Sequence, residues 1–133
     1  MATNPTRYIA YPEAVAFHIR LLRRLGESRF GVDHRGLIES ALARPQQAAT
    51  YENADMIRQA ATLLYGLIKN HPWLGGNKRT ASFLMKLFLQ RNGLRLAAPL
   101  EDEIAIVYEV EADRWKVDEI EIWLQQMVVS NLS

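Results

Sequence analysis

Residues 71–80, with the sequence HPWLGGNKRT, constrain the fold more than any other part of the chain. Pro72 ends the helix that precedes it, because a residue before proline avoids the helical region of backbone space. Gly75 and Gly76 then permit a tight connection, and an apolar helical pattern resumes a few residues later. These ten residues therefore predict two helices joined by a short loop.

The start of the second helix is an expected anion-binding point. The N–H groups of a helix's first turn lack intrahelical partners, and the helix dipole places partial positive charge there. Lys78 and Arg79 follow directly, although cations are unfavourable at that end unless something negative is bound. We therefore predict a phosphate ligand at the loop. The segment is not a P-loop, because the Walker spacing is missing and no strand precedes it.

The chain has 133 residues, which suits a single domain over residues 1–133. It contains no cysteine, which excludes disulfides and thiolate metal sites and favours a reducing compartment. No apolar run is long enough to span a bilayer, and the N-terminus lacks the apolar core of a signal peptide. We therefore expect a cytoplasmic protein without a membrane partner.

The charges are distributed unevenly along the chain. From Met56 to Leu100 there is no Asp or Glu, and the Lys and Arg side chains give this segment a charge of +7. Since the net charge is +1, the remainder of the chain carries −6. The asymmetry indicates an anionic ligand near the middle of the chain. The alternative is a basic face that acidic helices of the same fold neutralise.

Apolar residues recur with helical spacing through most of the chain. We predict helices near residues 12–25, 36–44, 53–69, 77–92 and 99–110, and a last helix from 118. Only residues 7–10 and 94–96 have an extended pattern. The predicted fold class is all-α, a compact bundle of about six helices with at most a small β ribbon.

Local signals give these helices their expected ends and faces. Pro45 should stop the second helix, and Gly93 should cap the fourth in a left-handed conformation. Asp118 should cap the last helix, with Glu121 completing a capping box. The first helix should bury a stripe made of Val15, Ile19, Leu22 and Leu25.

His71 stands where the helix meets the loop. A neutral imidazole there could take the proton of an incoming hydroxyl, since histidine titrates near neutral pH. The alternative is a histidine that caps the last carbonyl groups of the preceding helix. The Asn77 side chain can cap the second helix, and Trp73 is expected to anchor the loop in the core.

The segment 71–80 resembles the central motif of the Fic/Doc superfamily. Fic members typically read His-Pro-Phe-x-(Asp/Glu)-Gly-Asn-Gly-Arg, and the Doc branch, the "death on curing" toxins, reads His-x-Phe-x-Asp-(Ala/Gly)-Asn-Lys-Arg-Thr-Ala. Lys78 in place of the Fic glycine, followed by Arg79, Thr80 and Ala81, favours the Doc branch. Residues 36–45 (GLIESALARP) and 88–93 (FLQRNG) also fit, so the resemblance covers nearly the whole chain.

Resemblance to Doc implies a toxin that transfers a phosphoryl group from ATP, or another nucleoside triphosphate, to a hydroxyl of a protein. In Doc that protein is translation elongation factor Tu. By matched position, His71 would be the general base, and the phosphates would be held by Gly75, Gly76, Asn77, Lys78 and Arg79. Lys78 would crowd the usual Fic phosphate path, which fits a reversed nucleotide that presents its γ-phosphate.

One departure from the family pattern concerns the metal. The motif's acidic position, which in the family binds Mg²⁺, is Gly75 here. Asp33 and Glu52 are the candidates for a compensating carboxylate; otherwise nucleotide and water alone would hold the ion. The metal ligands are therefore not assigned. A Gly75→Asp change is expected to restore the ligand, provided that residue 75 does not adopt a positive φ.

The expected partner is an antitoxin on a separate chain. Fic proteins that inhibit themselves carry Ser/Thr-x-x-x-Glu, and no glutamate here has Ser or Thr four residues before it. An antitoxin helix would dock in an apolar groove, which we expect near the N-terminal half. Two functional alternatives stay open: a weak or inactive Doc-like protein that still binds antitoxin and anion, and a nucleotidyl (AMP) transferase of Fic type. The scattered cations disfavour a nucleic-acid partner.

Overall fold

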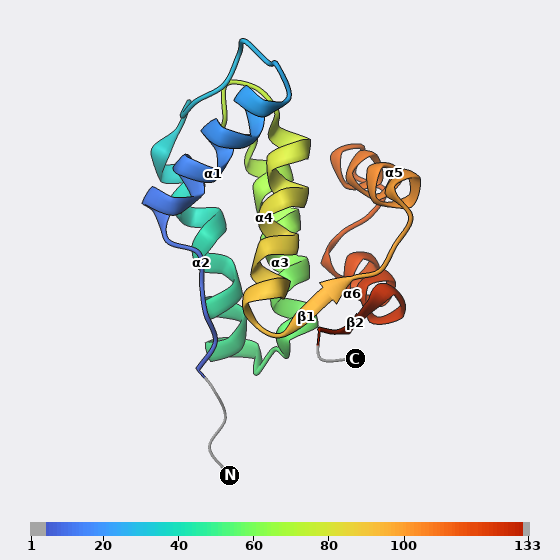
Figure 1. Cartoon of the computed structure of the whole chain (residues 1–133). Coiled ribbons are helices and arrows are strands. Elements are labelled where there is room, and N and C mark those ends of the chain that lie inside the picture. The colour runs from blue at the N-terminus through green and yellow to red at the C-terminus, as the bar shows by residue number, and fades with distance from the viewer. Residues whose placement is uncertain (1–4, 132–133) are drawn as a thin grey trace.

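A computed structural model describes residues 5–131, which form a helical bundle with a short two-stranded ribbon (Figure 1). The elements in chain order are α1 (Tyr11–Arg24), α2 (Arg35–Glu52), α3 (Met56–Asn70), α4 (Asn77–Arg91), β1 (Leu94–Leu96), α5 (Leu100–Glu111), α6 (Val117–Met127) and β2 (Val128–Ser130). The predicted class, an all-α bundle of about six helices with a small β ribbon, is confirmed.

Helix α3 is the centre of the core. It packs against α2, α4, α5 and α6, and it lies beside α4 in the middle of the molecule (Figure 1). Leu63, Leu64 and Leu67 are each no more than 1% exposed, so apolar side chains point outward from several sides of the helix. A helix surrounded in this way is held mainly by burial of apolar surface, which is the largest stabilising term in folding. The helix pair α3–α4 is therefore a rigid support for the loop that connects it.

Helix α2 is longer than predicted, because Pro45 lies inside it and does not end it. Proline removes one helical hydrogen bond and costs about 3 kcal/mol in an ordinary helix interior. Here Pro45 is itself buried, on the same face as Ile38, Ala41, Leu42 and Ala48. This face packs on α3, where Gly66 lets the Arg44 side chain approach closely. Tertiary burial thus outweighs the local signal.

Helix α1 buries a different face from the predicted one. Its buried residues are Ala14, His18 and Leu22, whereas Leu25 is 47% exposed and ends the helix as its C-cap. Leu22 is common to both faces, but Ala14 and His18 are buried in place of Val15 and Ile19, so a histidine occupies the centre of the buried face. This buried polar group becomes important for the functional site.

The last helix is also capped differently from the prediction. Its N-cap is Lys116, whose backbone N–H donates to Glu119 Oε1 at 2.7 Å. Asp118 and Glu121 instead accept hydrogen bonds from Arg58 Nη1 on α3, at 2.6 and 2.9 Å. These two acidic residues therefore attach α6 to the central helix, a role that local spacing does not reveal.

The β ribbon closes the end of the bundle away from the α3–α4 loop (Figure 1). β1 pairs antiparallel with β2, with Arg95 opposite Val129. The prediction that residues 94–96 are extended is confirmed. Gly93, which precedes this strand, has the expected left-handed conformation, with φ 83°. Residues 7–10 form no strand; their backbone is held instead by the Asn92 side chain, which bonds Arg7 N and O. Within residues 5–131, no helix has the length and apolar character required to cross a bilayer.

Candidate functional site

The loop between α3 and α4 turns sharply through two left-handed residues. His71, the C-cap of α3, has φ 47°, and Gly76, the N-cap of α4, has φ 67°. A side chain at position 76 would also lie 2.5 Å from Leu22 Cδ1, so glycine is required there for both reasons. A non-glycine residue with positive φ is uncommon and often marks a functional position, which directs attention to His71.

The segment between α1 and α2 fastens this loop in place. Leu74 N–H donates to Gly31 O at 2.9 Å, and the N–H groups of Asp33 and His34 both donate to Pro72 O at 3.0 Å. Two segments about forty residues apart in the sequence are thus hydrogen-bonded to each other. The helices predicted from the sequence leave both segments outside helices, but no local pattern predicts that the two segments pair.

Asn77 is buried and organises the loop from inside. Its Oδ1 accepts from Trp73 N–H and its Nδ2 donates to Trp73 O, both at 3.0 Å. The predicted role of its side chain as a helix cap is wrong, because the N-cap is Gly76 and Asn77 is already helical. Its side-chain amide instead crosses the turn and bonds to both the N–H and the carbonyl group of Trp73.

His71 projects from the loop and is exposed. Its Nδ1 lies 3.4 Å from Asn77 Nδ2, the only hydrogen bond of its side chain to the described part of the chain, so the helix-capping alternative finds no support. Because Asn77 Oδ1 is committed to Trp73 N–H, Nδ2 faces the ring, Nδ1 accepts, and the neutral imidazole carries its proton on Nε2. A bond this long fixes that tautomer only weakly. A small ring movement that breaks this bond frees the unprotonated Nδ1 to accept a proton.

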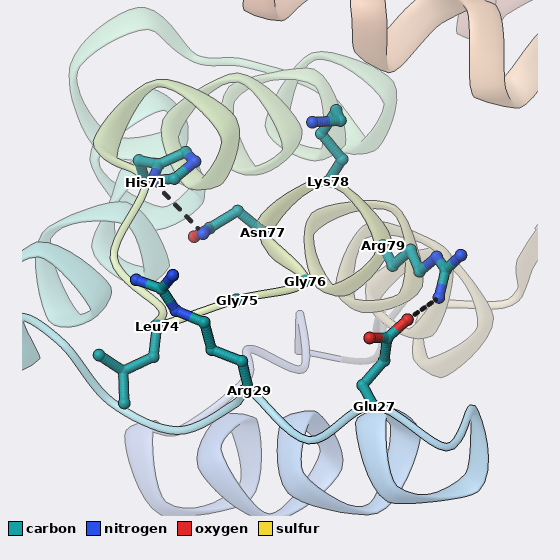
Figure 2. Close-up of a pocket in the computed structure, with 9 residues that line it drawn as sticks. All are labelled: Glu27, Arg29, His71, Leu74, Gly75, Gly76, Asn77, Lys78 and Arg79. Atoms are coloured by element: carbon teal, nitrogen blue, oxygen red, sulfur yellow. Dashed lines mark hydrogen bonds and ion pairs between the residues drawn. The ribbon is translucent and has the colours of Figure 1, made fainter.

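All six site residues predicted from the sequence line one cavity of about 380 Å³. Figure 2 shows them around the start of α4, together with three residues that the sequence did not indicate. The complete lining is Glu27, Arg29, His71, Leu74, Gly75, Gly76, Asn77, Lys78 and Arg79. The first intrahelical bond of α4 runs from Thr80 N–H to Gly76 O at 2.9 Å, so the N–H groups of residues 77–79 precede the helical ladder. The cavity thus combines backbone donors with cationic side chains.

Carboxylates already engage the two cations of the motif. Arg79 Nη1 lies 3.0 Å from Glu27 Oε1, and Lys78 Nζ lies 3.0 Å from Glu111 Oε2 on α5. Lys78 also lies over the Tyr108 ring, 5.1 Å from its centroid. Ion pairs as exposed as these contribute about 1 kcal/mol or less. A bound phosphate, which carries more charge and several acceptor oxygens, can therefore compete for both cations.

A protein-held Mg²⁺ does not fit the residues of this cavity. Asp33 and Glu52, the acids expected to compensate for Gly75, do not line it: Asp33 lies 3.5 Å from His34 Nε2, and Glu52 pairs with Arg58. The carboxylate that does line it is Glu27, which Arg79 already engages. Residues 5–131 contain no cluster of three His, Cys, Asp or Glu side chains suited to a metal ion.

The space around Gly75 argues against restoring the missing carboxylate by mutation. Gly75 does not have a positive φ, but a Cβ at this position would overlap the Arg29 carbonyl oxygen. We now expect Gly75→Asp to lower the unfolding free energy by about 1–3 kcal/mol, the usual cost of overpacking, and to leave Mg²⁺-dependent transfer no faster. Denaturant unfolding and a transfer assay measure the two quantities.

A matched control for this change is Gly36→Asp. Gly36 lies in the first turn of α2 with nothing near its Cβ position, and an acidic residue suits that end of a helix. This variant should be as stable as the wild type or slightly more so. If Gly75→Asp were equally stable and transferred faster in Mg²⁺, the steric argument would be wrong.

His18 is a residue of the site that sequence reasoning missed. It is 0% exposed, its ring stacks on Trp73 with centroids 4.0 Å apart, and its Nε2 accepts from Gly31 N–H at 2.9 Å. Nδ1 must then carry the proton and donate to Thr80 Oγ1, 2.7 Å away. His18 thus joins α1, the segment before α2, and the start of α4. Burial lowers the pKa of this imidazole to about 4.

Trp73 is the core anchor that the sequence predicted, at 1% exposed. Together with His18 it forms a stacked pair directly beneath the loop, so the backbone of residues 73–77 rests on a rigid support. The sequence feature that could have predicted the burial of His18 is its helical spacing, four residues from both Ala14 and Leu22 on α1.

Comparison with known proteins agrees with this geometry. The model of the Fic/DOC family matches residues 8–89, which include α1, α2, α3, the loop and most of α4. The chain belongs to the Fic/DOC family. Two relatives from this family are similar to it: "Toxin Doc" of Mycolicibacterium smegmatis, 43% identical over 70 residues, and "Protein kinase doc" of Escherichia phage P1, 33% identical over 91 residues.

The extent of these matches differs. The match to the mycobacterial protein covers 50% of this chain and 52% of that relative, so it spans about half of the relative's length. The match to the phage protein covers 68% of this chain and 71% of the relative. Both results agree with the resemblance to the Doc branch that residues 71–81 indicate.

Proposed function

We propose that this Fic/DOC protein is a Doc-like toxin that binds a nucleoside triphosphate, ATP or a related nucleotide, in the cavity at the start of α4. In this proposal it transfers the γ-phosphoryl group to a hydroxyl of a protein. The observation that carries the proposal is the convergence of His71, the first turn of α4, Lys78 and Arg79 on one cavity. The name of the phage relative, a protein kinase, supports the reaction class.

The proposed chemistry uses each group for one task. His71 takes the proton of the attacking hydroxyl, whose oxygen forms a bond to the γ-phosphorus as the bond to the β–γ bridging oxygen breaks and the nucleoside diphosphate leaves. The N–H groups of residues 77–79, with Lys78 and Arg79, stabilise the negative charge of the transferring group. Lys78 occupies the position of the Fic glycine, which favours a nucleotide that presents its γ-phosphate.

The proposed partners follow from the family. Translation elongation factor Tu is the protein substrate that resemblance to Doc suggests, and a relative named as a toxin is consistent with inhibition by a separate antitoxin chain. Exposed apolar side chains lie in both halves of the chain: Leu25 at the end of α1 is 47% exposed, and Leu100, Ile104 and Tyr108 on α5 are each about half exposed or more. An antitoxin helix would bury such side chains.

The test of the proposed reaction uses ATP labelled in turn at the γ- and α-phosphates. Incubation of the chain with each nucleotide and purified elongation factor Tu, or a cell lysate, should place label on protein from γ-labelled ATP only. Label from α-labelled ATP would instead establish nucleotidyl transfer. Gel autoradiography followed by mass spectrometry identifies the modified residue.

The specific observation behind the second candidate, an inactive or weak member, is Gly75. The motif lacks its carboxylate, and the Arg29 backbone occupies the space that a side chain would need. If neither label reaches protein although the chain binds nucleotide, this second reading replaces the first. The binding measurement is therefore made on the same preparation.

A further inference from the structure

Arg29 lines the cavity but has no part in the proposed reaction. It lies in the connection between α1 and α2, and its carbonyl oxygen and Cγ both face Gly75. Figure 2 shows its side chain running alongside the loop, with the guanidinium on the side of the cavity that His71 and Asn77 line. The space that a side chain at position 75 would need is thus taken by the backbone and side chain of Arg29.

The charge of Arg29 has no partner in the part of the chain that the structure describes. Arg79 is paired with Glu27, and Lys78 with Glu111, whereas no ion pair, hydrogen bond or ring contact involves Arg29 within residues 5–131. The side chain is exposed and lines the cavity, so it can bind a ligand without first breaking an interaction. It is therefore the cation of the cavity most available to an anion.

We propose that Arg29 binds the phosphates of the nucleotide and supplies the positive charge that a carboxylate-held divalent cation supplies elsewhere in the family. This inference rests on the proposed nucleotide site. A guanidinium presents a planar fork of N–H donors that matches two phosphate oxygens, which makes it a suitable substitute for charge neutralisation. The cavity has no metal-binding cluster, and a carboxylate at position 75 is sterically blocked. Polyphosphate binding by this chain should then depend little on divalent cations.

The experiment measures ATP binding by calorimetry in excess EDTA and again in millimolar Mg²⁺. The wild type should bind ATP in both buffers with dissociation constants that agree within about 5-fold. In EDTA, Arg29→Gln should weaken binding by about 10- to 100-fold, the usual effect of losing a charge-assisted hydrogen-bonding pair. Arg29→Lys should lie between them, because it keeps the charge and loses the fork.

The matched control is Arg95→Gln, which removes the same charge from an exposed side chain on β1, at the other end of the molecule (Figure 1). It should bind ATP as the wild type does. The Arg29 side chain makes no ion pair, hydrogen bond or ring contact in the described structure, so thermal melting of Arg29→Gln should match the wild type and show that the fold is intact.

Two results would overturn the inference while leaving the proposed function in place. One is wild-type binding in Mg²⁺ that weakens more than about 100-fold in EDTA, and the other is unchanged affinity in Arg29→Gln. Absence of ATP binding by the wild type in both buffers would overturn the nucleotide site itself, and the role of Arg29 with it.

Discussion

Replacement of His71 by alanine is expected to lower the rate of phosphoryl transfer by about 10²- to 10⁴-fold, the usual contribution of a general base. His71 lines the cavity, and its ring makes one hydrogen bond within residues 5–131, a long one to Asn77. Loss of the ring should therefore leave the fold and the nucleotide affinity nearly unchanged. The rate loss should appear in kcat, because proton removal from the attacking hydroxyl occurs in the transition state.

The backbone of His71 requires a second variant. Its φ of 47° lies in the left-handed region, which asparagine tolerates better than most side chains. His71→Asn therefore removes the base with the least disturbance of the turn. Single-turnover rates with γ-labelled ATP, together with calorimetric affinities, compare both variants with the wild type. Wild-type rates in either variant would remove His71 from the mechanism.

As the pH falls, the protein should lose stability because of His18 before the carboxylates of the protein are protonated. Burial lowers the pKa of His18 from 6.5 to about 4, so between these values the unfolded chain binds a proton and the folded chain does not. The stability that depends on neutral His18 is thus fully present above pH 6.5 and declines as the pH falls. The loss is about 1.4 kcal/mol per pH unit and about 3 kcal/mol in total by pH 4.

The structural cause is the accepting role of Nε2. A proton on Nε2 would replace the bond from Gly31 N–H with a contact between two donors, in a site with no exposure to water. Because His18 also contacts Trp73 and Thr80, the loop of the cavity should loosen together with the fold. Urea unfolding at half-unit steps from pH 7 to pH 5 measures the effect.

The control for this prediction is His18→Gln, which keeps a polar side chain and does not titrate. It should be less stable than the wild type at pH 7 but should lose much less stability between pH 6.5 and pH 5. Glu13, Glu109 and Asp113 also have lowered pKa values, because each accepts from an arginine or lysine, but their stabilising effect is lost only as acid protonates carboxylates, at lower pH. Equal pH slopes in both proteins would contradict the role of His18.

Local sequence determined most of the helices and the chemistry of the loop. The helix predicted at residues 77–92 is α4 (Asn77–Arg91), and the left-handed Gly93 follows it as expected. The six predicted site residues, between His71 and Arg79, line one cavity because they are neighbours in sequence and need only one turn to converge. Helical periodicity, proline and glycine act over a few residues, so they can be read without knowledge of the rest of the chain.

Tertiary structure alone decided which distant residues complete the site. Pro45 stays inside α2 because the face around it is buried against α3, and His18 is neutral because α1 and the loop enclose it. Glu27 and Arg29 reach the cavity because the segment between α1 and α2 bonds to the loop before α4. Each of these outcomes depends on burial and on contacts between segments far apart in the chain, and neither leaves a periodic or local pattern in the sequence.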